Sequence, residues 1–550
     1  MNLSNILTVF LCCNLATPLL SQINPDYKIL EVNNIRTGLN SNGLLFYNES
    51  DNGSFQVPND EEGDNPCALN AGNLIIIGVD EAENIKGSIG MYETQWQSGF
   101  LDIETGLPFT SPKMNQNRVW SITKIEIEEH RQRIADCDEN YEIPIDILEW
   151  PATGNVYYDG QMNQRAAPFF DNNENEVYEP LLGDFPIVGY DRIGAIPDQL
   201  MFAVTNDFGD MHFGGQLYSN LEVFTMLYAY NSDELDALNN SVFQRHYITN
   251  RGVNDLQNTS IGFWYDTALG CPEDDRIGCD TLQRAMYVYN GDPIDGDQSN
   301  GCIDDSVQSY PSSSVLVTKL LTYIAFIDLD FGSFIGWGTS GEATPDNNQI
   351  DLTIEGIYNL VQGRWSDDTP ITLADTGFNP DSLDLEETKF LFQGNPKDLD
   401  AWVSPSDDYQ VMMNTSQFRL PPGVSFHFEV VHTFAHSDTL DHLEIIDKGL
   451  SDADSAQYYL LEYEHDYPTF PIDINKAIIY PNPTSGQITV ETEGDLNTYE
   501  LYTTDGRFIE SGWVPRSGSL FFDKPRGVFN LVLRFGDETI QTERIVILDR

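Results

Sequence analysis

Oxygen-bearing side chains alternate along one segment of the chain, FFDNNENEVYEPLLGDFP. Calcium loops place their ligands in this way, because a hard cation takes about six to eight oxygens and a tightly wound loop turns every second side chain inward. Glu176 and Leu182 replace the glycine and the bidentate glutamate of an EF-hand, so we expect an acidic β-protein loop, with a solvated Asn-rich turn as the alternative. The expected ligands are Asp171, Asn173, Asn175, the carbonyl group of Val177, and Glu179 or Asp184.

A second acidic segment is Asp266 followed by CPEDDRIGCD. It holds five carboxylates within 15 residues and a single basic residue, Arg276. Such crowding is unfavourable unless a cation offsets it. We therefore expect calcium at this segment too, with a solvated acidic loop as the alternative; the expected ligands are Asp266, Asp274, Asp275 and Asp280. The segment YNGDPIDGDQ, with Asp292, Asp295 and Asp297, is a weaker version of the same pattern.

Four of the eight histidines are His427, His432, His436 and His442. If FHFEVVHTFAH is a strand, His432 and His436 share a face and could be two zinc ligands. The absence of HExxH and of a nearby cysteine favours histidines that are hydrogen-bonded within a strand. The sequence contains no GxSxG and no Walker A motif, and with 87 acidic residues its spacing does not locate a glycosidase-type carboxylate pair.

The charge of the chain excludes some classes of partner. Twenty-eight Lys and Arg stand against 87 Asp and Glu, which gives a net charge of −59. That field repels a phosphate backbone and an anionic membrane surface, so nucleic acid is not an expected partner. The 40% hydrophobic and 12% aromatic content exceeds that of a solvated polyanion and predicts a folded chain.

The elements that must position these side chains are mainly β. Short β-branched and aromatic runs recur between turns over residues 22–473, and no long stretch shows an apolar period of 3.6 residues. Residues 122–134 fit either a helix or, through Ile125 and Ile127, a strand. The clearest strand candidates are 74–79, 119–127, 199–204, 221–230, 260–265, 315–327 and 424–434.

The N-terminal end reads as a secretory signal. An apolar stretch from Ile6 to Ala16 is too short to span a bilayer, and Ser21 offers a cleavage point before Gln22. No later segment approaches the roughly 20 apolar residues of a transmembrane helix. We expect the mature chain to be exported, with no transmembrane segment.

Five cysteines follow the signal segment, so at least one is unpaired. In an oxidising compartment Cys271 and Cys279 could close a short loop, with Cys302 as the competing partner. Free buried thiols are the alternative. The remaining two are Cys67 and Cys137.

Residues 474–550 differ in charge from the rest, with eight basic and eleven acidic residues, and read as short strands between Asn-Pro, Asp-Gly and Gly-Asp turns. A seven-stranded sandwich fits this length. The ordered motifs are Tyr480-Pro481-Asn482-Pro483 with Gly486, the 502–506 turn, Gly527-Val528-Phe529 and the 544–548 strand. This set resembles the C-terminal sorting domain of type IX secretion cargo. The resemblance implies export through the periplasm by the type IX machinery, removal of the domain, and a secreted or cell-surface product.

The body resembles large secreted proteins of bacteria that use type IX secretion, through its APFFD, EVFTMLYAYN, DDRIGCD and GRWSDD segments. That resemblance does not indicate a particular activity. The expected fold is mainly β, with several antiparallel β-sandwich domains and a small Ig-like sandwich at the end. The expected parts are a signal peptide (1–21), an N-terminal β domain (22–150), a central β domain with acidic loops (151–340), a second β-sandwich (341–473) and the sorting domain (474–550).

Two classes of function fit these expectations. The first is a non-catalytic secreted or surface protein, whose calcium-stabilised β domains contact a glycan, a matrix or a surface partner. The second is a secreted hydrolase, a glycosidase or peptidase, whose site is built from carboxylates or histidines. A cavity that holds paired acids would favour the second class.

Overall fold

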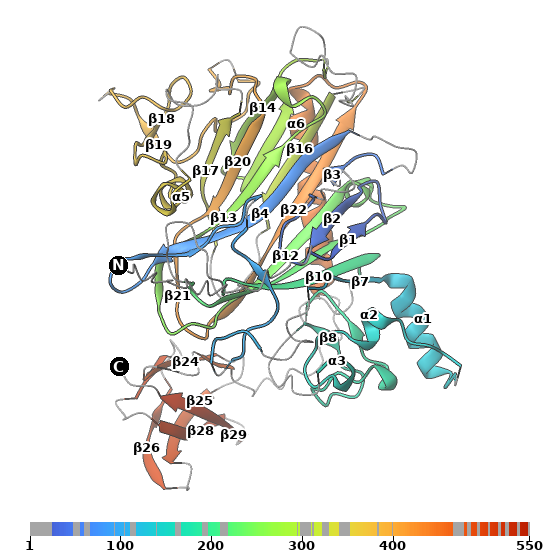
Figure 1. The fold of residues 1–550 in the computed structure, drawn as a ribbon, viewed down its shortest axis with the longest axis vertical. Helices are drawn as coiled ribbons and strands as arrows, with labels where there is room; N and C mark the ends of the chain where they lie inside the picture. The colour runs from blue at the N-terminus through green and yellow to red at the C-terminus, as the bar shows by residue number, and fades with distance from the viewer. Residues whose placement is uncertain are drawn as a thin grey trace, which may run out of the picture.

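Two large antiparallel sheets dominate the computed structural model (Figure 1). The structure describes residues 25–547 except for 48–54, 60–65, 93, 104, 110–116, 139, 160–166, 190–195, 209–217, 294, 297–309, 311–312, 322–328, 340–351, 382–383, 399, 466–477, 481–483, 485, 492–495, 504–506, 515–518, 523–526 and 536–539. The expected signal segment, 1–21, lies outside these residues.

The larger sheet has nine strands in the order β14-β15-β16-β22-β12-β11-β10-β6, with β7 also paired to β10. All the residues of β10, β11 and β16 are buried. Their apolar residues therefore stand in short runs, such as LMFAV in β10, rather than alternating with polar residues. The bounds are β6 (Gln97–Ser98), β7 (Trp120–Thr123), β10 (Gln199–Asn206), β11 (Leu221–Ala229), β12 (Ser241–Asn250), β14 (Asp275–Asp280), β15 (Ala285–Asn290), β16 (Ser313–Leu320) and β22 (Ser425–Ser437).

The smaller sheet has seven strands. Its order is β17-β20-β13-β4-β3, with β21 also paired to β13 and β5 to β4. The bounds are β3 (Phe55–Gln56), β4 (Cys67–Val79), β5 (Ile85–Ser88), β13 (Leu256–Thr267), β17 (Phe331–Gly338), β20 (Tyr409–Thr415) and β21 (Phe418–Leu420). Strands from the three ranges expected as separate domains, 22–150, 151–340 and 341–473, share these two sheets.

The two sheets pack face to face. Leu227 of the larger sheet and Phe263 of the smaller one belong to a single buried core. Successive strand residues point to opposite faces, so Tyr228, next to Leu227, enters a second core on the outer side of the larger sheet. There it packs with helical residues such as Ile147 of α2 (Ile145–Leu148) and Leu460 of α6 (Glu444–His465). The larger sheet is therefore the middle layer of the body.

A helix follows β7 directly. Thr123 caps α1 (Lys124–Ala135): its side chain accepts the N–H of Glu126, while the Glu126 side chain accepts the N–H of Thr123. This capping box separates the strand from the helix. The helical interpretation of 122–134 is confirmed from Lys124 onward, and the strand expected over 119–127 is wrong beyond Thr123.

The sequence shows no long stretch with an apolar period of 3.6 residues, yet the body contains a long helix, α6, with 22 residues. Ala453 and Ala456 lie in its buried face with Leu460, so small residues supply much of that face. An ideal Cβ on Gly449 would lie 2.6 Å from Cγ1 of Val315. The glycine therefore permits α6 to approach β16 closely.

The other strand expectations are confirmed: 74–79 lies in β4, 199–204 in β10, 221–230 covers β11, 260–265 lies in β13, and 424–434 covers most of β22. The run 315–327 is confirmed in β16 as far as Leu320, and 322–328 is outside the described residues. Smaller elements are β1 (Tyr27–Leu30), β2 (Thr37–Asn40), β8 (Phe169–Phe170), β9 (Phe185–Pro186), β18 (Ile371–Thr372), β19 (Glu387–Thr388), α3 (Val156–Asp159), α4 (Asp236–Asn239) and α5 (Ile354–Val361).

The C-terminal segment has seven described strands around its own core. One sheet has the order β23-β24-β27 and the other β26-β25-β28-β29. Ile488 of the first sheet and Leu531 of the second are buried together, which makes this part a small sandwich, as expected. The bounds are β23 (Ile478–Tyr480), β24 (Gln487–Glu491), β25 (Leu496–Thr503), β26 (Phe508–Trp513), β27 (Ser519–Phe521), β28 (Gly527–Phe535) and β29 (Ile540–Ile547).

Among the described residues, no helix combines the length and hydrophobicity needed to cross a bilayer.

Candidate functional site

The 171–184 loop, where alternating oxygen ligands are expected, winds into a tight turn. Asp171 accepts the N–H of Glu176 over 2.6 Å, and Asn175 accepts the N–H of Val177 over 2.8 Å. Glu176 has a φ of 63°, in the left-handed region that favours glycine. The backbone therefore adopts a glycine-like conformation at the position where an EF-hand has its glycine, although this chain has glutamate there.

Two further acids complete the loop. The carboxylate of Glu179 accepts the side-chain amides of Asn173 and Asn175, over 3.1 and 2.6 Å. Asp184 is fully buried and accepts the N–H of Glu179 over 2.6 Å. Burial raises the pKa of Asp184 to about 6, and the charges of Asp171 and Glu179 add to the shift. The structure thus brings the expected side chains together in one turn that is held by its own hydrogen bonds.

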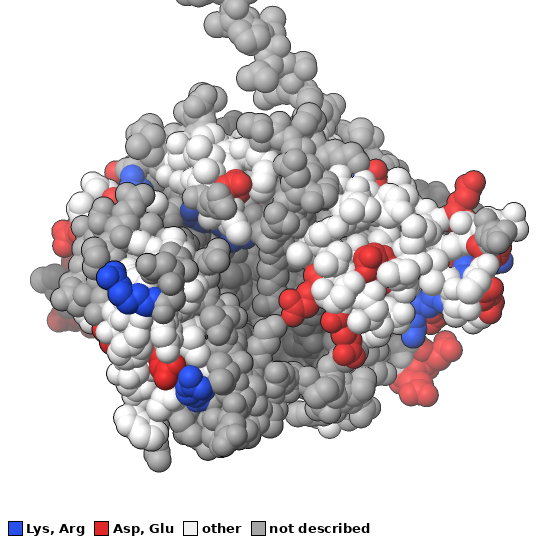
Figure 2. Space-filling view, turned by 90° about the horizontal axis from the view of Figure 1, so that it is seen from below, with Lys and Arg blue, Asp and Glu red and all other residues white. Residues whose placement is uncertain are grey.

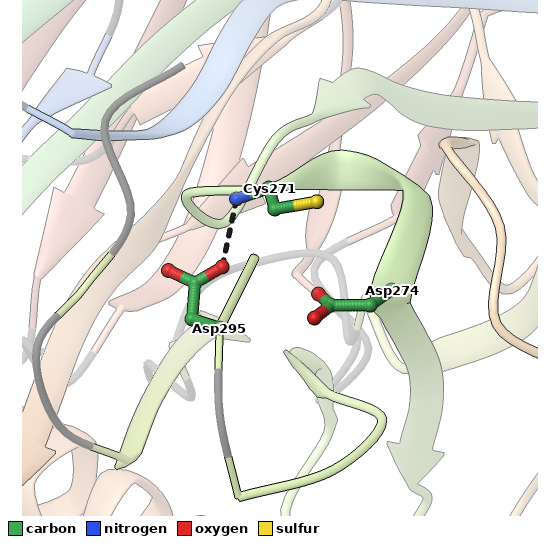
Figure 3. A group of neighbouring side chains, drawn as sticks. All are labelled: Cys271, Asp274 and Asp295. Carbon is green, nitrogen blue, oxygen red and sulfur yellow. Dashed lines mark hydrogen bonds between the residues drawn. The ribbon is translucent and has the colours of Figure 1, made fainter. Parts of the chain in front are cut away.

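The two remaining acidic motifs converge on one place. Asp274 ends the 3-10 turn η4 (Pro272–Asp274) and Asp275 begins β14, whereas Asp295 comes from the segment after β15. The carboxylate of Asp274 is directed toward Asp295, and Cys271 lies above the gap between them (Figure 3). One potential ligand atom from each of Cys271, Asp274 and Asp295 lies within 4.8 Å of the other two, and all three residues are buried.

Backbone N–H groups hold these carboxylates in place. Asp295 accepts the N–H of Cys271 over 2.9 Å and also that of Tyr310. Asp274 accepts the N–H of Gly296 over 3.1 Å, and Asp275 accepts that of Leu269 over 2.8 Å. The carboxylate positions are therefore set by the chain itself.

Burial and mutual repulsion both act on this cluster. Burial raises the pKa of Asp295 to about 7, and the charges of Asp274 and Asp292 contribute to the same direction. Burial also raises the pKa of Asp275 well above its ordinary value, again with contributions from Asp274 and Asp295. Such shifts mark groups whose ionised forms lack a compensating positive charge.

The sulfur of Cys271 is not available to a metal as a thiolate, because Cys271 is disulfide-bonded. Cys67, Cys137 and Cys279 are not disulfide-bonded. The expected Cys271–Cys279 pairing is therefore wrong: β14 carries Cys279 into the sandwich core, away from the loop. Cys302, the competing partner, lies outside the described residues.

Asp266 and Asp280 lie apart from this cluster. Asp266, near the end of β13, accepts the hydroxyl of Tyr92, and burial raises its pKa to about 6 with a contribution from the charge of Asp408. Asp280 stands at the far end of β14, roughly 16 Å from Asp275 at the rise of an extended strand. Its carboxylate accepts the N–H groups of Leu282 and Gln283, both over 2.9 Å. Asp280 therefore does not share a site with Asp274 and Asp275.

Asp280 instead lines a cavity of about 310 Å³ between α6, the β14–β15 hairpin and the 394–395 turn. Lysines engage two of its three carboxylates: Lys319 pairs with Asp454, and Lys397 pairs with Asp447. The lining residues are Asp280, Gln283, Tyr287, Gly394, Asn395, Ile446, Asp447, Leu450, Ser451 and Asp454.

A buried polar chain crosses four strands inside the sandwich. Thr225 contacts His246 over 3.0 Å, and His246 contacts Gln244 over 2.6 Å. Gln244 contacts His432 over 2.9 Å, and His432 contacts Thr318 over 3.0 Å. Both ring nitrogens of His432 thus have protein partners, which confirms a hydrogen-bonded strand histidine. The zinc alternative for His432 and His436 therefore finds no support in this geometry.

Sequence reasoning treated Asp295 as part of a separate, weaker motif. The signal that joins the two motifs is the hairpin: DRIGCD and AMYVYN are short strands flanking a four-residue turn, so the acids before the first and after the second meet at one end. Asn290, opposite Asp275 in that hairpin, was missed for the same reason.

On the face seen from below, acidic side chains lie in separate groups with basic side chains among them (Figure 2). The described surface on that face therefore mixes both signs of charge.

No protein-family model matches the sequence. No curated protein matches it either. A solved structure described as a polysaccharide lyase has 10% sequence identity and a TM-score of 0.16, and the match covers 70% of this chain and 39% of that one. The chain thus spans about two fifths of that protein's length, and a likeness this weak carries no argument about function.

Proposed function

We propose that the chain is an exported protein, secreted or held at the cell surface, whose calcium-stabilised β domains contact a neutral glycan without catalysing a reaction. The observation that carries this proposal is the cavity lined by Asp280, Gln283, Asn395 and Ser451. Carboxylate, amide and hydroxyl groups recognise sugar hydroxyls, and Tyr287 with Leu450 adds an apolar wall. The net charge of −59 disfavours acidic polysaccharides.

The ion pairs in the cavity favour binding over hydrolysis. Glycoside hydrolysis needs one carboxyl group that donates a proton and a second that acts as base or nucleophile. Lys397 and Lys319 hold Asp447 and Asp454 as ion-paired acceptors. Asp280 is the third carboxylate of the lining, and it already accepts two backbone N–H groups of the adjoining turn. The described lining of the cavity therefore offers no pair of carboxyl groups that are both without such partners.

The proposal of export rests on two segments, the expected signal peptide (1–21) and residues 474–550. The motifs of residues 474–550 resemble a type IX sorting domain, and the seven described strands of this part form the small sandwich expected for it. The partner for export would be the type IX machinery. A matrix or another surface protein is the alternative ligand after export.

Binding is tested by titrating neutral oligosaccharides into the purified protein in calcium, by calorimetry, with product analysis for hydrolysis. Asp280→Asn keeps an oxygen for the adjoining turn but removes the charge, so it should weaken binding about tenfold with the fold intact. Asp233→Asn, at an exposed site on another loop, is the matched control. Equal affinity in wild type and Asp280→Asn contradicts the cavity as the site, and turnover that Asp280→Asn abolishes establishes the hydrolase instead.

A further inference from the structure

Asp275 and Asn290 lie directly opposite each other in the antiparallel register of β14 and β15. Opposite residues in such a pair leave the sheet on the same face, with Cβ atoms about 5 Å apart. Both side chains are buried, 0% and 1% exposed. They lie on the face that carries Ile277 and Val288 into the core between the sheets.

Each of these side chains has one acceptor oxygen without a donor among the described residues. No donor from the described part of the chain reaches Oδ1 of Asp275 or Oδ1 of Asn290. A buried acceptor without a partner is costly, and an ion is one of the few explanations for it. Asn290 is uncharged, so its orphaned oxygen is an observation independent of the acidic cluster.

The remaining acids converge on the same end of the hairpin. The N–H of Gly291, next to Asn290, donates to the carbonyl oxygen of Asp274 over 2.7 Å, so Asn290 and Asp274 are tied together. Figure 3 shows the carboxylate of Asp274 directed toward Asp295. Gly270 has a φ of 70°, and a Cβ on it would lie 2.0 Å from Oδ2 of Asp295, so the chain leaves room for that carboxylate only because glycine stands there.

Arg276 is the one basic residue of these two motifs, and its Nε donates to the hydroxyl of Ser406 over 3.3 Å. No lysine or arginine stands between Arg284 and Lys319 in the sequence, whereas Asp292, Asp295 and Asp297 do. Three buried carboxylates held in fixed positions by backbone N–H groups repel one another. A divalent cation among them would neutralise two of the three charges and give both orphaned oxygens a partner.

We propose that Asp274, Asp275, Asp295 and the carboxamide oxygen of Asn290 are the ligands of a buried calcium ion at the end of the β14–β15 hairpin. This centre deepens the calcium part of the proposed function and is independent of the glycan cavity at the other end of β14.

The donor set selects the class of metal. All four donors are oxygens, which suit hard cations, and the disulfide removes the sulfur of Cys271 that a soft metal would need. Magnesium demands near-ideal octahedral geometry and keeps its waters, whereas calcium accepts six to eight oxygens in irregular arrangements, at about 2.4 Å. Ligands drawn from a 3-10 turn, two strands and a loop therefore favour calcium.

The test measures calcium bound to the full-length chain after chelation, by calorimetry, and the difference in melting temperature between calcium and EDTA. Asp295→Asn should remove one bound calcium per chain, or lower its affinity at least tenfold, and should shrink the melting difference. Because Asn relieves repulsion, Asp295→Asn should also melt no lower than wild type in EDTA. Asp171→Asn, in the other acidic loop, is the matched control and should leave this binding event unchanged.

A second variant keeps the test independent of Asp295. Asn290→Asp adds a fourth carboxylate, so it should raise the calcium affinity severalfold if the ion is there and should lower the melting temperature in EDTA. If both variants bind the same number of calcium ions with wild-type affinity, the cluster holds no cation and its acids stay protonated instead. Oligosaccharide binding is measured separately with Asp280→Asn, so a failed calcium centre and a failed glycan site give different results.

Discussion

The backbone N–H of Cys271 donates to the carboxylate of Asp295 over 2.9 Å, so a disulfide-bonded residue orients an acid of the buried cluster. The disulfide restricts the loop that carries this N–H. Redox state and cation binding should therefore be coupled at this end of β14.

Reduction should weaken calcium binding. Without the disulfide the 268–274 loop gains freedom, and ordering it around the ion costs conformational entropy. We expect the calcium affinity to fall about threefold to tenfold in a strong reductant. Titration with and without reductant measures this, and Cys279→Ala, which removes a free buried thiol, is the control for general thiol effects. An affinity that is identical in both conditions contradicts the coupling.

Acid should destabilise the sandwich through its two buried histidines. Burial lowers the pKa of His246 and of His432 from the ordinary 6.5 to about 3, and for His432 the nearby His246 adds to the effect. Below pH 6.5 the unfolded chain binds protons that the folded chain does not. The stability that the neutral rings contribute is thus present above pH 6.5 and is lost as the pH falls toward 3, by about 1.4 kcal/mol per pH unit for each ring.

Denaturant unfolding between pH 6 and pH 4 measures this slope. The double variant His246→Gln/His432→Gln should flatten the loss by about 3 kcal/mol per pH unit, because neither glutamine titrates. Asp207, whose pKa burial raises to about 6, acts in the opposite sense and is common to both proteins. Parallel slopes in the two proteins are the result that contradicts the prediction.

Gly449 should be required for the packing of α6. A Cβ there would lie 2.6 Å from Val315 and 2.9 Å from Val317, so Gly449→Ala forces α6 away from β16. Overpacking of this kind costs about 1–3 kcal/mol, which outweighs the gain of about 1 kcal/mol in helix propensity. Ser451→Ala, at an exposed position of the same helix, is the control and should be neutral or slightly stabilising. A melting temperature at or above wild type in Gly449→Ala contradicts this packing.

These residues also show why some elements could be predicted from sequence and others not. Seven of the nine residues of β11 are apolar or aromatic, because both of its faces are buried, and such a run is visible without any partner. The buried face of α6 relies on Ala453 and Ala456, and Gly449 makes its approach to β16 possible, so its hydrophobic period is weak. Its helical character depends on a tertiary contact that sequence periodicity does not report.

The candidate site divides in the same way. Asp274 and Asp275 could be found because they are adjacent in an acidic segment. Asp295 and Asn290 lie near them only because of the register of the β14–β15 hairpin. Asp280 lies apart from them, because it stands at the other end of β14. Spacing along the chain predicts a local loop but not which ends of two strands meet.

Export should depend on residues 474–550. Their motifs resemble a type IX sorting domain, and they form a sandwich with its own core, so deleting them should leave the body folded. We expect the truncated chain to accumulate in the periplasm, whereas the full-length chain reaches the surface or the medium and loses this domain. Fractionation with an antibody against the body measures the distribution. Normal delivery of the truncated chain contradicts the sorting role.

Calcium binding by the folded chain underlies both the proposed function and the proposed centre at the β14–β15 hairpin. Melting of the full-length protein in millimolar calcium, in magnesium and in EDTA tests it directly. We predict a clear rise of the melting temperature in calcium, a smaller rise in magnesium, and a partial loss of the calcium effect in Asp171→Ala, because the 171–184 loop winds oxygen-bearing side chains into one turn and Asp274 and Asp295 lie close together. Identical melting curves in calcium and EDTA would contradict it.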